Sequence, residues 1–132
     1  MPYIDPEPKW AHDTWKRTPD DWQGAQREVR AHLIATARRR SVTTYLEIHG
    51  SISSTEIPST GNAFQNAIGV LLGQVNLIES RRFSKRMMLS AVAVNKDLHP
   101  GAGVQRVLEK MEWEGDWPTW LATVWRTYAK LK

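Results

Sequence analysis

The residues that could support catalysis are few and scattered. Histidines stand at positions 12, 32, 49 and 99, and the chain has no cysteine. No two histidines have the spacing of a zinc site on a helix, and thiolate ligands and thiol nucleophiles are excluded. Glu47 and His49 are two residues apart in an expected helix, so they point to different sides. The residues predict no catalytic group, no metal site and no cofactor, which leaves enzyme activity open and favours a non-enzymatic protein.

Phosphate-binding and nucleophile motifs are also missing. The chain has no Gly-Lys-Thr/Ser loop, and the segment 101–103 (Gly-Ala-Gly) lacks the remaining glycine and the context of a dinucleotide fingerprint. No serine lies in a nucleophile-elbow sequence. One hypothesis, less favoured than the two described below, is a small metal-independent ribonuclease that uses His49 or His99 with nearby arginines.

Positive charge is concentrated in two blocks of the chain. Residues 22–50 contain five Arg and two Glu, and residues 81–108 contain six basic residues and Asp97. The whole chain carries +4, so the rest of it is net negative. Such a distribution is typical of a protein that binds a polyanion, although a solvated basic face would have the same composition.

Composition indicates one globular domain. Of 132 residues, 41% are hydrophobic and 24% are charged. No apolar run approaches the roughly 20 residues that span a bilayer, and the first residues lack the pattern of a signal peptide. The absence of cysteine suits a reducing compartment. We therefore expect a cytoplasmic protein with no membrane partner, made of an arm over residues 1–17 and a single domain over residues 18–132.

The chain reads as a series of helices with one clear strand. Thr18-Pro19-Asp20-Asp21 is a helix start, and apolar residues recur at helical spacing to about residue 40. Thr44 and Glu47 form a capping box that predicts a short helix ending at Gly50. Further helices are expected over 62–80, over 104–111 and from Asp116 onward. The segment 87–95 is expected to be a strand buried on both faces.

The helix over 62–80 has an unusual outward side. Asn62, Asn66, Gly69, Gly73 and Asn76 recur at spacings of three and four. A small, polar face permits close approach by another backbone. It favours either a tight helix crossing or a helix that lies in a groove of nucleic acid, with amide side chains reaching outward.

Tryptophan and acidic residues support a second hypothesis. Seven Trp occur near the two ends of the chain, and Glu109, Glu112, Glu114 and Asp116 form an acidic stretch. The Trp residues are expected to pack the chain ends together. A Trp-rich or acidic surface would also suit a protein-interaction module, such as a small inhibitor or adaptor, or a homodimer.

The order of the expected elements resembles that of winged helix-turn-helix domains. Val42-Thr43-Thr44-Tyr45-Leu46-Glu47-Ile48 is similar to the start of the corresponding helix in alkyltransferase-like DNA-binding domains. The resemblance covers roughly residues 25–104. It departs from the alkyltransferases because the nucleophilic cysteine is absent, and the loop between Gly50 and Asn62 is longer than a usual helix-turn-helix turn. It implies a mainly α-helical (α+β) fold with a small β-hairpin or wing and a C-terminal helix.

The resemblance also implies roles for particular residues. The helix over 62–80 would be the reading helix and the turn over 96–103 the wing, in a small non-enzymatic nucleic-acid-binding protein that prefers DNA to RNA. Phosphate contacts would come from the basic segments 38–40 and 81–86 and from the wing. Base edges would be read by amides near the start of the helix. The candidate nucleic-acid-binding residues are Arg38, Arg39, Arg40, Thr44, Asn62, Gln65, Asn66, Arg81, Arg82, Lys85, Arg86, Lys96 and His99.

Overall fold

The structure is a computed structural model that describes residues 19–54, 57, 61–99 and 116–130. In these ranges the helices are α2 (Pro19–Arg38), α3 (Tyr45–Gly50), α4 (Gly61–Phe83) and α6 (Trp117–Ala129), with the 3-10 helix η1 (Leu89–Val92) and the strands β1 (Thr43–Thr44) and β2 (Ala93–Val94). The expected mainly helical fold is confirmed. The arm over 1–17, the helix over 104–111 and the wing residues 100–103 lie outside the described ranges.

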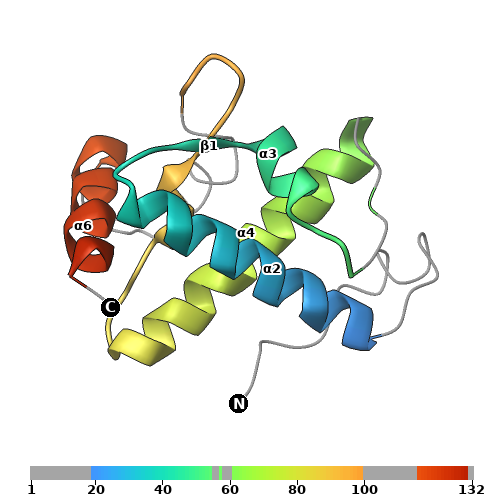
Figure 1. Ribbon diagram of the computed structural model, residues 1–132, viewed down its shortest axis with the longest axis horizontal. Coiled ribbons are helices and arrows are strands. Elements are labelled where there is room, and N and C mark those ends of the chain that lie inside the picture. Colours follow the sequence, from blue (N-terminus) through green and yellow to red (C-terminus); the bar gives the residue numbers. More distant parts are fainter. Residues whose placement is uncertain (1–18, 55–56, 58–60, 100–115, 131–132) are drawn as a thin grey trace.

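Helices α2 and α4 cross each other and form the body of the molecule (Figure 1). Each residue of the apolar stripe expected on α2 is fully buried: Trp22, Ala25, Val29, Leu33 and Ala37. The apolar stripe of α4 faces it and is buried from Phe64 to Val75, while Ile78 is only half-buried. Burial of these two faces is the main source of stability because apolar surface leaves water.

Polar contacts hold the two helices in one register. Gln74 on α4 accepts hydrogen bonds from the Trp22 indole and from the Gln26 amide, each at 2.8 Å. Both donors lie on α2, four residues apart, so they occupy the same helix face. A buried amide that lacked such partners would be costly, and this favours one arrangement of the helices over others of similar apolar packing.

The segment 87–94 runs through the centre of the fold. All eight of its residues are buried, as the sequence predicted. It contacts α2, α4 and α6, so helices rather than a second sheet cover it. The prediction of a strand over 87–95 is wrong for most of its length, because the first part forms η1 and only two residues form β2. An apolar run of this length fits either conformation, and packing against helices decided between them.

The two strands are parallel. Thr43 pairs with Ala93 and Thr44 with Val94, although 48 residues separate the two strands in the chain. The expected β-hairpin is therefore not what these strands form, since a hairpin joins antiparallel neighbours. Parallel pairing needs a crossover connection, and α3 with α4 provides it here. Because the strands run in the same direction, α3 follows β1 and the loop over 95–99 follows β2 at the same edge of the pair.

Helix α3 begins at the capping box that the sequence predicted. The Thr44 side chain accepts a hydrogen bond from the Glu47 backbone N–H at 3.2 Å, and Glu47 accepts one from the Thr44 backbone N–H at 3.0 Å. The bond from the Thr44 backbone N–H to the Glu47 carboxylate, with a second from the Thr44 hydroxyl, holds the Glu47 pKa below its usual value of 4.5. Two otherwise unpaired backbone donors are satisfied in this way, so the short helix has a defined start.

Helix α4 extends three residues beyond the predicted end. It therefore includes Arg81 and Arg82, which the sequence placed in a connection. Asn76, which the sequence placed on the outward side, is buried instead: its amide donates to Ser90 Oγ at 2.8 Å, and its Oδ1 accepts from Ser90 N at 2.9 Å. Asn76 does lie near the outward line of α4, but η1 covers that part of the helix and buries the side chain.

Helix α6 closes the far end of the core. Asp116 caps it by accepting a hydrogen bond from the Thr119 backbone N–H at 3.0 Å, and Pro118 follows in the first turn, as predicted. The Trp117 indole donates to the carbonyl of Ala91 at 2.7 Å, which ties the helix to η1. No helix in the described ranges is long and apolar enough to cross a membrane.

Candidate nucleic-acid interface

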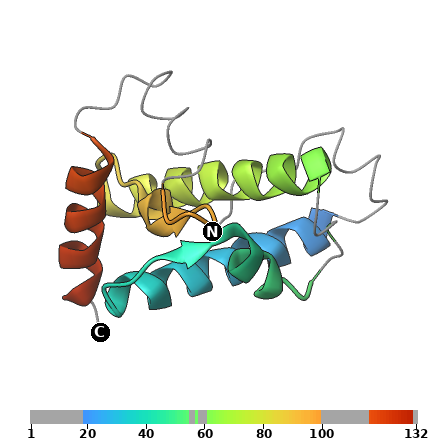
Figure 2. The ribbon, with the colours of Figure 1, turned by 90° about the horizontal axis from the view of Figure 1, so that it is seen from above.

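Helix α6 lies across the C-terminal ends of α2 and α4 (Figure 2). The Trp125 indole donates to the carbonyl of Ser41 at 2.9 Å, just after α2 ends. The rings of Tyr128 and Phe83 meet edge to face with centroids 5.7 Å apart, at the last residue of α4. The C-terminal half of α6 therefore brings the ends of two other helices to one end of the molecule.

Basic residues are concentrated at this place, which we name the basic end. It consists of nine exposed side chains on or just after the three helix ends: Arg38, Arg39, Arg40, Arg81, Arg82, Lys85, Arg86, Arg126 and Lys130. The sequence-predicted segments 38–40 and 81–86 thus lie at the end of the molecule that α6 covers (Figure 1). Basic residues also stabilise helix C-termini, and this local effect accounts for one or two cations per helix.

Glu79 lies on α4, two residues before Arg81 of the basic end, and it is fully buried. Its carboxylate accepts a bond from Arg30 Nε at 2.6 Å and another from the Tyr128 hydroxyl, and it lies 3.6 Å from Arg82 NH1. Burial, reinforced by the hydrogen bond to Glu79, raises the pKa of Tyr128 above its ordinary value. The buried carboxylate is paired most closely with Arg30, and Arg82 of the basic end also contacts it.

Glu79 is a residue that the sequence analysis missed. It lies four residues after Val75, on the buried stripe of α4, and a charged residue at an apolar position of a helix is the signal that could have identified it. Its partners come from α2, α4 and α6, so no local pattern could have named them.

Helices α2 and α4 end in the same left-handed motif. Arg40 has φ of 52° and the next residue, Ser41, bonds to Thr36 O; Ser84 has φ of 55° and Lys85 bonds to Ser80 O. Glycine is the usual residue at this position, since a Cβ there costs about 1–2 kcal/mol. The chain keeps a charged residue at Arg40 despite that cost.

A second group of candidate residues lies at the shared edge of the parallel strands. Thr44 ends β1, and Lys96 and His99 belong to the loop that follows β2. The hydroxyl of Thr44 is engaged in the capping box, so its role in this structure is to begin α3. Lys96 and His99 are exposed. The strand register places this loop just beyond the Thr44 end of β1, whereas Arg40 precedes the Thr43 end.

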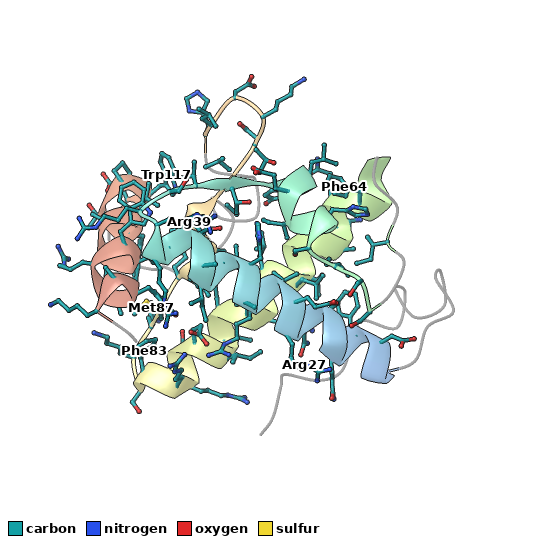
Figure 3. All side chains as sticks on the ribbon, in the orientation of Figure 1. Arg27, Arg39, Phe64, Phe83, Met87 and Trp117 are labelled. Atoms are coloured by element: carbon teal, nitrogen blue, oxygen red, sulfur yellow. The ribbon has the colours of Figure 1, made fainter. Side chains whose placement is uncertain are left out.

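The expected base-reading residues lie at the other end of α4. Gln65 and Asn66 are exposed, whereas the side chain of Asn62 is not among those described. Sixteen residues separate Asn66 from Arg82, about 24 Å along a helix. Figure 3 shows this separation through the labelled Phe64 and Phe83, which mark the two ends of α4. The structure therefore does not bring the amides and the segment 81–86 together.

The outward stripe of α4 nevertheless connects these two ends. Asn66, Gly69, Gly73, Leu77 and Arg81 follow one another at spacings of three and four and are exposed or half-exposed. A Cβ at either glycine would meet nothing within 4 Å. The tight helix crossing that the sequence left open is therefore absent from the described part of the chain at this stripe.

The groups considered for catalysis are not assembled. His49 Nε2 lies 2.6 Å from Ile57 O and its ring packs on Phe64, so it supports the loop between α3 and α4. His99 lies in the loop after β2. Within the described ranges no three His, Asp or Glu residues could hold a metal ion together. Of the acidic stretch, only Asp116 is described, and it caps α6.

His32 is a half-buried base beside the first strand. Its Nε2 lies 2.7 Å from Thr43 Oγ1. Burial lowers its pKa below the usual 6.5, Arg39 lowers it further, and Glu47 opposes both. Because the folded protein resists protonating His32, the unfolded chain binds more protons below pH 6.5. The stability that the neutral His32 ring contributes is fully present above pH 6.5. It is lost as the pH falls toward the lower pKa that His32 has in the folded protein.

This predicts a pH dependence that one substitution removes. His32→Gln, which can keep a hydrogen bond to Thr43 but cannot be protonated, is expected to lose less stability than the original protein between about pH 7 and 5. Urea denaturation at several pH values measures the two slopes. Equal slopes would show that His32 has the same pKa in the folded and unfolded chains.

No family model matches the chain, and no match was found among curated proteins or among solved structures.

Proposed function

We propose that the protein is a non-enzymatic nucleic-acid-binding protein whose phosphate contacts come from the basic end. The observation that carries the proposal is charge segregation: nine exposed cations lie at one end of three helices, and the nearby Glu79 of α4 is buried against Arg30. Phosphate backbones are the ligand that such a surface suits, because binding releases counterions from both.

The outward stripe of α4 provides a second part of the proposal. A duplex that lies along it would contact Arg81 at one end and Gln65 and Asn66 at the other. The two glycines leave space for a groove wall to approach the helix. The stripe length of about 24 Å corresponds to roughly seven base pairs at 3.4 Å each. On this proposal the arginine contributes affinity, and the amides, which suit adenine, contribute sequence preference.

A winged-helix-like arrangement belongs to the same proposal. Helix α2, then β1 with α3, then α4 and β2 follow the order of such domains, and the loop over 95–99 takes the place of the wing. We favour DNA as the ligand and the cytoplasm as the location. The parallel strand pair is the departure from that architecture.

The direct test is binding at two salt concentrations. Fluorescence anisotropy with labelled random duplex and single-stranded DNA and RNA, at about 50 and 200 mM salt, is expected to show affinity that falls at least about 100-fold across that range. Binding that is absent at the lower concentration, or that does not change with salt, would contradict the proposal. A pull-down for a protein partner would then be the next experiment.

A further inference from the structure

The loop over 95–99 presents an aliphatic side chain to solvent. Leu98 is 61% exposed and has a positive φ of 64°. A leucine with left-handed backbone is strained, and glycine or asparagine would relax it. Packing does not require a leucine at this exposed position. The strained backbone at Leu98 therefore points to a role of this side chain in binding.

The loop is held in a defined shape. The Asn95 side-chain oxygen accepts hydrogen bonds from the backbone N–H groups of Asp97 at 2.9 Å and His99 at 3.1 Å. The Asn95 backbone donates to His99 O at 2.8 Å, and Leu98 N donates to Asn95 O at 3.0 Å. These bonds close the loop on itself, so Leu98 is held in one exposed position without a large loss of entropy when it binds.

The charges around Leu98 identify the kind of contact. Lys96 and Asp97 are neighbours of opposite sign and both are exposed, so the loop gains little from phosphates. Its distinguishing group is the exposed apolar side chain of Leu98. The arginines at residues 38–40 lie just before β1 and this loop lies just after β2, so a duplex that spans the strand pair would contact both.

We propose that Leu98 inserts between base pairs in the minor groove of duplex DNA while the basic end binds the backbone. Aliphatic wedges of this kind unstack a base step and kink the duplex. The proposal rests on the proposed function and makes it specific for double-stranded DNA. The minor groove of A-form RNA is wide and shallow, and single strands offer no groove to enter.

The test compares three variants of the full chain. Leu98→Asn relaxes the backbone strain and removes the wedge, so it is expected to keep or raise the melting temperature and to lower affinity for duplex DNA about tenfold or more. The slope of log affinity against log salt should not change, because no phosphate contact is lost. Leu98→Met keeps an apolar tip and should bind nearly as well as the original protein. Leu46→Asn, at the other exposed leucine of this edge, is the matched control and should have no effect on binding.

A second measurement reports the insertion itself. A short duplex that contains 2-aminopurine is expected to become more fluorescent when the original protein binds and to stay unchanged with Leu98→Asn at saturating protein. If Leu98→Asn binds and brightens the probe as well as the original protein, the insertion is wrong while nucleic-acid binding stands. If the original protein binds no duplex at low salt, the proposed function is wrong and the insertion falls with it.

Discussion

Replacing Arg40, Arg81 and Lys85 together with glutamine is expected to lower affinity for duplex DNA on the order of 100-fold or more at about 0.1 M salt. The three side chains are exposed, and none of them forms an ion pair with an acidic residue in the described ranges. Each phosphate contact adds about 0.9 to the slope of log affinity against log salt, so the slope should fall by nearly three. Anisotropy over a salt series measures both quantities.

The control is the loss of one charge at a site on α2 that lies away from the basic end. Arg27→Gln changes the net charge as much as any one of the three substitutions, and Figure 3 shows Arg27 and the labelled Arg39 toward opposite ends of the helix. Single substitutions compared at equal net charge should show the larger loss of affinity at Arg40. Equal losses would mean that overall charge, rather than the basic end, attracts the nucleic acid.

Arg40→Gly separates binding from folding. Glycine relaxes the left-handed backbone at this position, so stability is expected to rise by up to about 1 kcal/mol while affinity falls. Denaturant unfolding and anisotropy on the same preparation measure the two effects. A variant that is more stable and binds as well as the original protein would remove Arg40 from the interface.

Replacing Arg30 with leucine is expected to reduce the free energy of unfolding by about 2–3 kcal/mol. The substitution removes the closest cation from the fully buried Glu79 and leaves it with the Tyr128 hydroxyl and the more distant Arg82. The value lies near the low end of the range for broken buried pairs because these two partners remain. Urea denaturation followed by tryptophan fluorescence measures the loss.

A compensated variant tests the cause. Arg30→Leu combined with Glu79→Leu and Tyr128→Phe removes the charge, its partner and the hydroxyl that would otherwise lack an acceptor. We expect this variant to be more stable than Arg30→Leu alone, because an apolar cluster has no charge to desolvate. If the single substitution costs little and the triple substitution costs more, then shape rather than the buried charge determines the stability of this cluster.

The helix boundaries were predictable because local chemistry sets them. Thr44 and Glu47 form their capping box within four residues, and Asp116 and Pro118 begin α6 in the same way. The apolar positions of α2 recur at the helical period, and the predicted stripe is buried. The expected extent of α4 was too short, because its last turn contains basic residues that resemble a connection in the sequence.

The candidate site was only partly predictable. The segments 38–40 and 81–86 were identified by charge alone, and their common position depends on α6, which bonds to Ser41 and contacts Phe83. The placement of Gln65 and Asn66 far from Arg82 follows from the length of α4. The strained Leu98 and the buried Glu79 have no sequence motif that reveals their backbone angle or their partners.

The sequence by itself determined which segments become helices, which of their faces are apolar and where positive charge is concentrated. These properties depend on residues within a few positions of one another, through capping, periodicity and side-chain charge. The tertiary structure alone decided that residues 87–94 form a central 3-10 helix and a parallel strand, that Glu79 has partners on three helices, and that α6 spans the basic ends of α2 and α4. Each of these outcomes depends on contacts between residues tens of positions apart, and local propensity does not encode such contacts.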